Sequence, residues 1–375
     1  MKMKSVFWFS AAVIAYCYIG YPLYLWLRSH FLPRPVRRGA AEPTVSALMV
    51  VRNEESLIAS KLKNVLALEY PRSKLEVVVV SDGSNDDTPA ILEQFSQDPR
   101  VRAIIKPAPC GKASGLNDAV ESACGDVLLF TDARQQIEPG ALNYLIENFA
   151  DPAVGAASGE LMLGDPTNGE TGKGMGMYWQ IEKKIRELES ASGSVPGATG
   201  AIYCARRALL EPLPEGTILD DVLLPMQVVR KGFRVVFDSR ARAWDSPDLG
   251  GSREFGRKVR TLSGNYQLVQ LAPWLLTADN KIRFEFISHK LSRLIAPFAL
   301  LGLLISSVFL AGPLYRAALI AQLAFYVLSI VALSGLRIGP LSWLADMART
   351  FVVLNSAALV AFVNFVTGRK AVWAR

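Results

Sequence analysis

Apolar residues are concentrated at the two ends of the chain and flank a long, more polar middle. Residues 6–27 carry no charge, and this run is long enough to cross a hydrocarbon core of about 30 Å as a helix. Its aromatic content and the lack of a small-residue cleavage site favour a membrane helix over a cleaved signal peptide. Apolar segments return near residues 291–310, 317–336 and 351–366. The last is short for a full span, so it either lies in the membrane interface or extends on its N-terminal side.

The middle of the chain alternates short apolar strands with segments of helical periodicity. Strands are predicted at 45–51, 75–80, 101–105, 127–130 and 235–237. Helices are predicted at 54–68, 88–95, 112–122, 140–149, 178–190 and 221–231, with a glycine-rich loop at 167–176. Such alternation predicts an α/β fold with a mainly parallel central sheet flanked by helices. Ligands of these sheets bind at the carboxyl ends of the strands.

These patterns divide the chain into five parts. They are an N-terminal transmembrane helix (1–30), a Pro- and Arg-rich linker (31–43), a cytosolic domain (44–270), an interfacial segment (271–290) and a C-terminal membrane region with two or three helices (291–375). Four arginines between Arg28 and Arg38 follow the first apolar run, and the positive-inside rule therefore predicts a cytosolic domain. Lys2 and Lys4 support the opposite orientation with fewer charges. Three later spans would place Arg369 outside, against the charge bias, so either the last segment does not cross or an element is miscounted.

Charge and cysteine content narrow the classes of function. The chain of 375 residues has a net charge of +7, which suits nucleic acid, anionic lipid or phosphate ligands. The basic residues cluster beside the apolar segments and no nucleic-acid motif is present, so headgroups and phosphates are favoured. Few ionisable residues interrupt the apolar segments, which argues against a transporter. The four cysteines lack metal-ligand spacing and are predicted to be free thiols in a reducing compartment.

Two acidic positions follow predicted strands. Asp82, in Ser-Asp-Gly-Ser-Asn-Asp-Asp-Thr at 81–88, could accept hydrogen bonds from a base or a ribose. An ordinary Asp-Gly turn with Asp87 or Thr88 as a helix cap explains the same residues. Asp132 follows the strand at 127–130 and could hold a divalent cation against a diphosphate. The alternative is a strand-end aspartate that caps the next turn.

Two further clusters lie later in the chain. Asp220 and Asp221 are adjacent carboxylates, and their repulsion could raise one pKa into the range of a general base. They could equally be dipole-favoured residues at a helix N-terminus. A basic run follows at Arg253, Arg257, Lys258 and Arg260. On a helix, Arg257 and Arg260 would share a face that could clamp a diphosphate, or that could be a solvated or headgroup-binding face.

The order of these signals from about residue 45 to 267 resembles that of the family 2 glycosyltransferases, which have a GT-A type fold. Asn53 and Glu54 resemble the Asn-Glu signature that contacts the nucleotide base, and Asp82 matches the acid that contacts the uracil of the donor. Lys112 stands in a segment similar to the family's G-K-A-x-x-L-N. Asp132 matches the first acid of the metal-binding D-x-D motif. The resemblance implies that these residues bind a nucleotide-sugar, with a UDP-sugar as the expected donor, and Mg or Mn at Asp132.

The same resemblance extends to the acceptor side. Gly200 lies in a segment similar to the family's acceptor-side glycine loop. Asp221 matches the general base, which follows an acid in most members, and Asp220 fills that place. Arg257 and Arg260 lie where membrane polysaccharide synthases carry Q-x-x-R-W. The resemblance implies that Asp221 is catalytic, that Arg260 helps Lys112 to stabilise the diphosphate, and that Gly200, Asp220 and Arg257 line the acceptor side.

Two departures qualify these expectations. Arg134 replaces the second acid of D-x-D, which removes one ligand from the expected metal site. The Q-x-x-R-W box keeps only Arg260, which disfavours a processive polymer synthase. The implied function is an inverting glycosyltransferase of a bacterial inner (cytoplasmic) membrane, with a polysaccharide or a lipid-linked acceptor. The alternative is a non-catalytic membrane scaffold that binds nucleotide-sugars. Nucleic acid is not an expected partner, and the sequence does not predict the oligomeric state.

Overall fold

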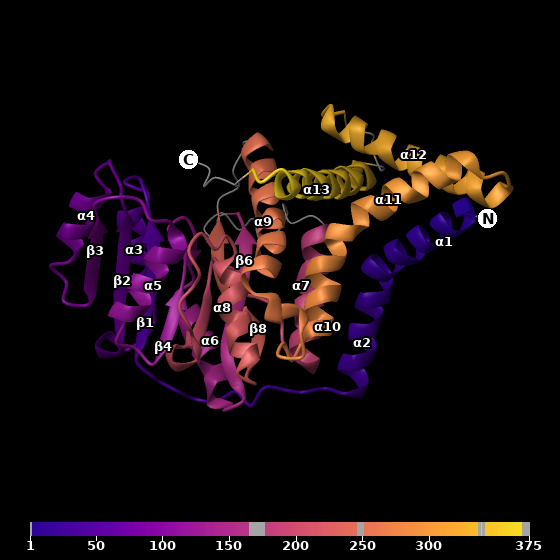
Figure 1. Ribbon diagram of the computed structural model, residues 1–375. Coiled ribbons are helices and arrows are strands. Elements are labelled where there is room, and N and C mark those ends of the chain that lie inside the picture. The colour runs from indigo at the N-terminus through magenta and orange to yellow at the C-terminus, as the bar shows by residue number, and fades with distance from the viewer. Residues whose placement is uncertain (1, 165–176, 246–250, 337–338, 340–341, 370–375) are drawn as a thin grey trace.

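The computed structural model describes residues 2–164, 177–245, 251–336, 339 and 342–369. The predicted glycine-rich loop at 167–176 lies outside this part of the chain. The described residues form a globular domain, from which several long helices project to one side (Figure 1).

A single mixed sheet is the centre of the globular domain. Its eight described strands follow the order β3-β2-β1-β4-β7-β6-β8-β5. They are β1 (Val45–Val51), β2 (Leu75–Asp82), β3 (Val101–Lys106), β4 (Val127–Phe130), β5 (Gln136–Ile137), β6 (Val154–Leu163), β7 (Tyr203–Arg206) and β8 (Arg234–Asp245). The first four strands are mutually parallel. β7 runs antiparallel to both of its neighbours, β4 and β6, while β6 and β8 are parallel and β5 is antiparallel to β8.

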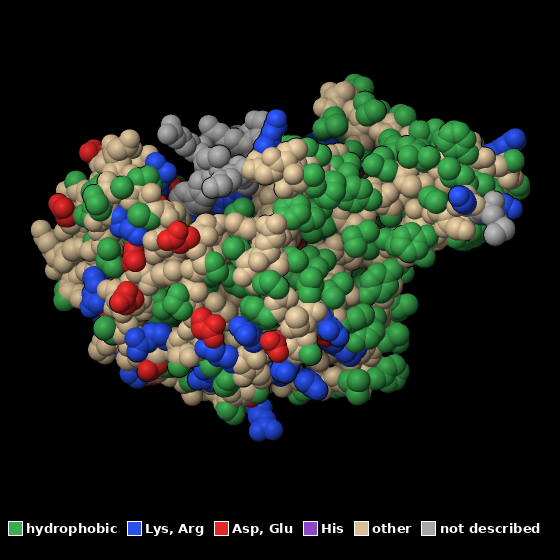
Figure 2. Space-filling model, viewed as in Figure 1, with side chains coloured by type: hydrophobic (Ala, Val, Ile, Leu, Met, Phe, Trp, Pro, Cys, Tyr) green, Lys and Arg blue, Asp and Glu red, His purple; other side chains and the backbone are tan. Residues whose placement is uncertain are grey.

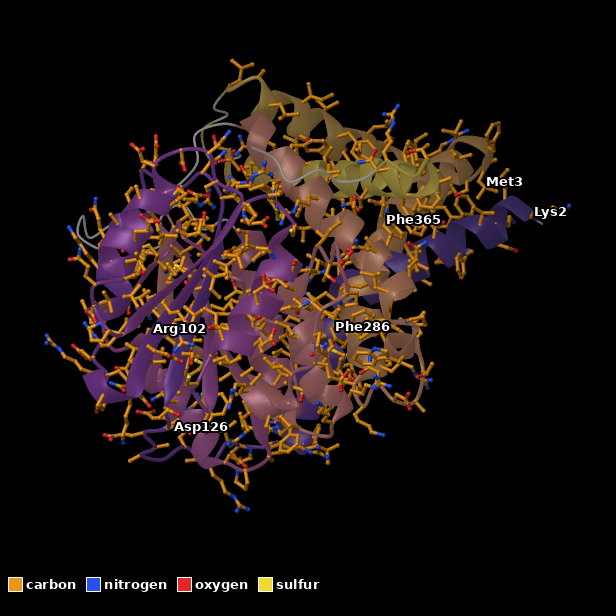
Figure 3. The ribbon with its side chains drawn as sticks, turned by 60° about the vertical axis from the view of Figure 1, so that its left-hand side comes forward. Lys2, Met3, Arg102, Asp126, Phe286 and Phe365 are labelled. Carbon is orange, nitrogen blue, oxygen red and sulfur yellow. The ribbon has the colours of Figure 1, made fainter. Side chains whose placement is uncertain are left out.

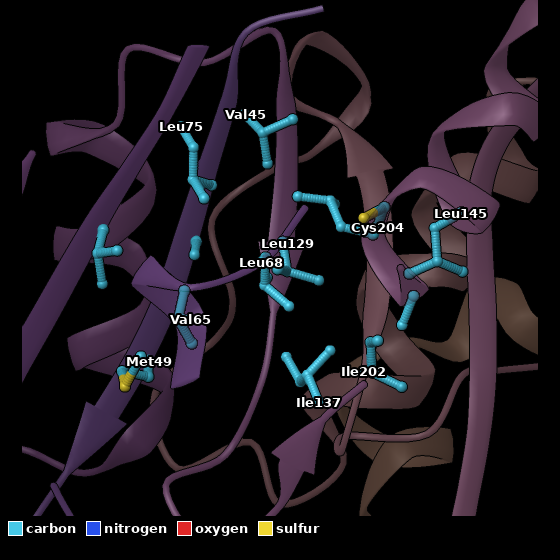
Figure 4. Packing of buried hydrophobic residues seen from close by; sticks show 14 of the residues in the cluster. Val45, Met49, Val65, Leu68, Leu75, Leu129, Ile137, Leu145, Ile202 and Cys204 are labelled. Carbon is cyan, nitrogen blue, oxygen red and sulfur yellow. The ribbon is translucent and has the colours of Figure 1, made fainter. Parts of the chain in front are cut away.

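Helices cover both faces of this sheet. They are α3 (Ile58–Leu66), α4 (Thr88–Phe95), α5 (Lys112–Ser122), α6 (Ala141–Glu147), α7 (Met177–Ser192), α8 (Asp220–Arg230) and α9 (Gly251–Leu271). Side chains of β2 alternate between two hydrophobic clusters, as the two-residue period of a strand requires. Val77 and Val79 pack in the cluster that includes α3 and α6. Figure 4 shows part of this cluster, with Val65 of α3 and Leu145 of α6 labelled. Val78 and Val80 pack in the cluster that includes α5 and α8. The predicted helix-flanked sheet is therefore confirmed.

The second half of the sheet differs from the prediction. β6 and β7 were not predicted, and β8 has 12 residues instead of the three expected. β6 is rich in glycine and alanine, so its sequence lacks the β-branched run that marks β2. A Cβ atom at Gly159 would lie 2.5 Å from the carbonyl oxygen of Ala241 on β8. The glycine is thus required by the close approach of two strands, which is a tertiary constraint.

One predicted helix cap is corrected. Asp87 or Thr88 was the expected cap of α4, and Asp87 does occupy the N-cap position, but its side chain makes no capping hydrogen bond. The Thr88 amide instead donates to Oδ1 of Asp86 at 3.0 Å. Asp86 reaches this amide because an aspartate accepts readily from the backbone two residues ahead.

Four helices in the described part of the chain are long and apolar enough to cross a membrane. They are Lys2–Phe31, Arg283–Phe309, Pro313–Leu333 and Ser342–Val366. The first comprises α1 (Lys2–Ala15), a π-helical turn (Tyr16–Gly20) and α2 (Tyr21–Phe31), and the second comprises α10 (Arg283–Phe286), a π-helical turn (Ile287–Leu291) and α11 (Ser292–Phe309). The other two are α12 and α13. Exposed hydrophobic side chains cover these helices, whereas charged side chains gather on the globular domain (Figure 2).

The final apolar segment extends on its N-terminal side to Ser342, one of the two alternatives that its length allowed. Its C-terminal half packs against α9 of the globular domain. Tyr266 stacks on Phe365 with ring centroids 5.0 Å apart, and Val259 packs against Ala357 and Ala361. The end of α13 therefore lies beside the globular domain (Figure 3, where Phe365 is labelled).

Candidate active site

The parallel strands β2, β1 and β4 end at the same edge of the sheet. Their registers place Val51, Ser81 and Phe130 near this edge, because Val51 pairs with Ser81 and Leu48 with Phe130. The predicted donor-binding segments follow these strand ends directly. The topology thus brings together segments that lie far apart in the sequence, at the edge where α/β sheets bind ligands.

Asp82 is held by backbone amides. Its Oδ1 accepts from the amide of Cys110 at 2.7 Å and its Oδ2 from the amide of Gly111 at 2.8 Å. The neighbouring Gly83 has φ of 63°, and a Cβ atom there would lie 2.4 Å from the nitrogen of Pro109. Only glycine fits this approach without a shift. Asp82 therefore fixes the loop that leads into α5 and Lys112.

Asn53 and Glu54 lie on the adjacent loop. Asn53 adopts φ of 55°, a left-handed conformation that asparagine tolerates better than most residues. Its Oδ1 accepts from the amide of Asn85 at 2.9 Å, and the amide of Glu54 donates to Oγ1 of Thr88 at 2.9 Å. The two predicted base-contacting residues are thus tied to the loop that follows Asp82.

Lys112 joins the predicted donor and acceptor sides of the site. Its ammonium donates to Oδ1 of Asp132 at 2.9 Å and lies 3.1 Å from Oδ2 of Asp220. Burial opposes the charge of Lys112, but the nearby carboxylates outweigh burial and raise its pKa. A persistently charged ammonium is therefore held between the end of β4 and the start of α8.

Gly200 lies where two carboxylates converge. A Cβ atom at this position would lie 3.3 Å from Oδ2 of Asp132 and 3.7 Å from Oδ2 of Asp221. The backbone of Asp221 is anchored to the same loop, because its carbonyl accepts from the amide of Ala198 at 2.7 Å. Any side chain at Gly200 would enter the space that these carboxylates face.

Asp221 has the titration expected of a general base. Burial, followed by repulsion from Asp220, raises the pKa of Asp221 to about 6, while the charges of Lys112 and Lys290 oppose the rise. Asp221 also lies in the first turn of α8. A carboxylate with this pKa is ionised at neutral pH and is a stronger base than an ordinary aspartate.

Sequence reasoning missed Lys61, which lies beneath this site. Its fully buried ammonium donates to Oγ1 of Thr131 at 2.7 Å and to the carbonyl of Gln135 at 2.5 Å. Burial lowers the pKa of Lys61 to about 7, against the attraction of Asp132. A signal was present in the sequence, because Lys61 stands on the apolar face of α3 beside Ile58 and Leu62.

Arg134 replaces an acid and is itself held by one. Its guanidinium pairs with Asp245, the last residue of β8, whose Oδ2 also accepts from Nε2 of Gln135 at 3.1 Å. The described residues contain no group of three His, Cys, Asp or Glu that could hold a metal ion. Lys112 contacts Oδ1 of Asp132 but not its Oδ2, and the side chain of Asp132 is 42% exposed. A single carboxylate of this kind fits a divalent ion whose other ligands are phosphate oxygens and water.

The predicted basic residues lie on α9. Arg257 and Arg260 are three residues apart and therefore share one side of that helix, and both are half-buried. Only the backbone of Arg253 is described. Contacts of Arg257 and Arg260 with a donor or an acceptor stay predictions.

Comparisons with known proteins find similarity to glycosyltransferases. The family model for glycosyl transferase family 2 matches residues 46–213. A poly-beta-1,6-N-acetyl-D-glucosamine synthase of Staphylococcus epidermidis is 24% identical over 245 residues, which are 64% of this chain and 58% of that protein. The probable glycosyltransferase YdaM of Bacillus subtilis is 28% identical over 243 residues, 60% of this chain and 56% of that protein. The chain thus matches little more than half the length of these relatives.

A solved structure shares the fold over nearly the whole chain. The mannosyltransferase PcManGT of Pyrobaculum calidifontis, in complex with GDP-Man and Mn²⁺, superimposes with a TM-score of 0.73 at 23% identity. The match covers 98% of this chain and 99% of that one. It therefore includes the projecting helices as well as the sheet, and it confirms the predicted fold class.

Proposed function

From the premise that this chain carries a family 2 glycosyltransferase domain, we propose that it moves a sugar from a nucleotide diphosphate sugar to a hydroxyl of a membrane-bound acceptor. The observation that carries the proposal is the convergence of Asp132 and Asp221 on Gly200, with the ammonium of Lys112 alongside. A diphosphate needs cationic partners and a hydroxyl needs a base. The site offers both within a few ångströms.

The proposed reaction assigns one role to each group. Asp221 accepts the proton of the acceptor hydroxyl as its oxygen attacks the anomeric carbon of the donor. The bond from that carbon to the diphosphate breaks through an oxocarbenium-like state, and Lys112 stabilises the negative charge on the departing diphosphate. Because the base acts on the face opposite the leaving group, the configuration at the anomeric carbon inverts.

A divalent ion fits this scheme at Asp132. Mg²⁺ or Mn²⁺ held by the free Oδ2 of Asp132 and by the donor diphosphate would neutralise charge on the leaving group. The two sources of positive charge, Lys112 and the ion, would then flank one carboxylate. Arg134 takes the place of a second acidic ligand. We therefore propose that sugar transfer depends less strongly on the metal than it would with two carboxylates at the site.

The donor nucleotide and the acceptor are narrower proposals. Asp82, Asn53 and Glu54 form the base-contacting edge, with UDP as the proposed nucleotide and GDP as the alternative to compare. The acceptor is a polysaccharide or a lipid-linked sugar. A scaffold without catalysis is the competing function, and Arg134 is the observation that favours it. Release of UDP from a UDP-sugar in the presence of an acceptor separates an enzyme from a scaffold.

The decisive test of catalysis is Asp221→Asn in the full-length protein. Loss of a general base lowers rates by about 10²–10⁴-fold, so sugar transfer should fall by that factor. UDP binding, measured by calorimetry, should stay within about twofold of wild type, because the donor side is intact. The matched control is Asp118→Asn on α5, where the carboxylate pairs with Lys106 instead of lining the site. Full activity of Asp221→Asn would refute the assignment.

We also propose an integral membrane protein of the bacterial inner membrane, with the globular domain in the cytosol. The apolar helices support membrane insertion. Cys110 and Cys124 are exposed on the globular domain, so a membrane-impermeant thiol reagent should label them in inverted vesicles but not in intact spheroplasts. Equal labelling in spheroplasts would overturn the orientation.

A further inference from the structure

The second long apolar helix begins in the hydrophobic cluster that also contains the start of α8. Phe286 is fully buried and Leu291 is half-buried, and both pack in the hydrophobic cluster that contains Leu219 and Val222. These two residues flank the pair of aspartates at the start of α8. The segment 286–291 therefore packs in the same hydrophobic cluster as the start of α8, and the helix Arg283–Phe309 meets the globular domain at Phe286 (Figure 3, where Phe286 is labelled).

Most charges at this junction are paired. His289 is held between Glu182 at 2.9 Å and Glu189 at 2.8 Å. Arg293 pairs with Glu182 at 2.6 Å, and Arg186 reaches the same carboxylate at 3.4 Å. One half-buried carboxylate, Glu182, thus serves several basic groups. Its contact with Arg186 is the longest of these, so the guanidinium of Arg186 keeps hydrogen-bonding capacity.

Lys290 differs from these neighbours. It is half-buried, yet among the described residues it makes no side-chain hydrogen bond and no ion pair. Its charge acts on Asp221 and on Glu182 at longer range. An ammonium removed from water without a partner is unfavourable, and an anion bound beside it would recover that free energy.

We propose that Lys290, with Arg186 as its neighbour, binds the phosphate of a lipid-linked sugar acceptor. The inference rests on the proposed function and deepens it, because it selects the lipid-linked acceptor over a neutral polysaccharide. Lys290 stands at the start of a helix long enough to span the membrane, which is the level at which the phosphate of a lipid carrier lies. The sugar of such an acceptor extends from its phosphate, and its hydroxyl is then directed toward Asp221.

The chemistry at this subsite is binding alone. The phosphate of the acceptor stays attached to both its lipid and its sugar. The proton that leaves the sugar hydroxyl goes to Asp221, and the bond that breaks is the one between the donor sugar and its own diphosphate. A neutral polysaccharide carries no group that would pair with Lys290 in this way.

The test compares two acceptors in the full-length protein, reconstituted in nanodiscs of neutral lipid. One acceptor is a polyprenyl diphosphate-linked monosaccharide and the other is the alkyl glycoside of the same sugar, which has no phosphate. In Lys290→Gln the KM for the diphosphate acceptor should rise by about tenfold or more, as expected for the loss of a charge-assisted hydrogen bond. At about pH 8.5, where Asp221 is ionised with or without the charge of Lys290, the kcat, the affinity for UDP and the KM for the glycoside should stay within about twofold. Lys290→Arg should restore most of the loss.

The matched control is Lys281→Gln, which removes an exposed lysine and should leave both KM values unchanged. An unchanged KM for the diphosphate acceptor in Lys290→Gln, or an equal rise for both acceptors, overturns the inference. Repeating the assay in nanodiscs of anionic lipid, or with added inorganic phosphate, tests two other occupants of the subsite. If Lys290→Gln changes the effect of anionic lipid or phosphate on the transfer rate but leaves the KM for the diphosphate acceptor unchanged, the subsite binds lipid headgroups or free phosphate. That result overturns the inference. Transfer to the glycoside but never to the carrier-linked sugar also overturns it, while the proposed function stands. No transfer to any acceptor overturns both.

Discussion

The proposed donor and acceptor sides of the site are stabilised in different ways. On the donor side, backbone amides hold the carboxylate of Asp82, and hydrogen bonds between two loops hold Asn53. On the acceptor side, charges oppose one another: Asp220 raises the pKa of Asp221, and Lys290 has no direct partner among the described residues. The proposed donor side is thus held in a fixed geometry by hydrogen bonds. The acceptor side keeps the unbalanced charges that proton transfer uses.

The largest effect on the donor side is expected from Asp82→Ala. This change removes two hydrogen bonds to a charged acceptor and releases the loop that leads to Lys112. Each such bond contributes about 1.5–3 kcal/mol, so the Kd for UDP should rise by about 10²-fold. The pH dependence of the remaining transfer should not move, because the groups around Asp221 are untouched.

Asp87→Asn is the matched control for this measurement, because Asp87 is exposed in the same segment. It should leave the Kd for UDP within about twofold of wild type. Calorimetry with UDP in detergent measures both variants. Equal affinity in Asp82→Ala and wild type would show that the donor side is not organised by Asp82.

The two sides also differed in how far their structure could be predicted. The strands at 45–51 and 127–130 and the helices at 88–95 and 112–122 have the predicted bounds. Their apolar runs and turn residues act locally, so the sequence pattern is sufficient. β6 was missed because its glycine and alanine residues give it little strand propensity, and β7 has four residues, none of which is β-branched. Their pairing depends on neighbouring strands far away in the chain.

The contacts of buried and half-buried charged side chains were harder to predict from the sequence than the strands were. Lys61 contacts Thr131 across 70 residues and Arg134 contacts Asp245 across 111. Motif order did identify Asp132 and Asp221, and the structure places both beside Gly200. Motif order could not show that a buried lysine lies beneath one of them. Only tertiary packing determines which long side chain reaches which carboxylate.

A smaller effect is expected where the two sides meet, at Arg134. The double variant Arg134→Asp with Asp245→Asn restores a second acid without leaving two like charges side by side. A second carboxylate should lower the Mn²⁺ concentration for half-maximal UDP release by about tenfold. Asp245→Asn alone is the control and should leave this concentration within about twofold. An unchanged Mn²⁺ requirement in the double variant would separate Arg134 from metal binding.

The smallest effect is expected at Asp220, and it concerns pH more than rate. Asp221 must be deprotonated to act as a base, so kcat/KM should rise with pH through the raised pKa of about 6. Asp220→Asn removes the repulsion and frees Lys112, whose charge also lowers the pKa of Asp221. Both changes move the acid limb of kcat/KM to lower pH, by roughly one unit.

Lys112→Gln should move the same limb to higher pH, because it removes an attraction. Above pH 7.5 the Asp220→Asn enzyme should keep most of its activity, whereas Lys112→Gln should also lose leaving-group stabilisation. Shifts of the same sign in the two variants would mean that the acid limb belongs to a group other than Asp221. The proposed contrast between a donor side held by hydrogen bonds and an acceptor side whose pKa values are set by opposing charges would then lose its main support.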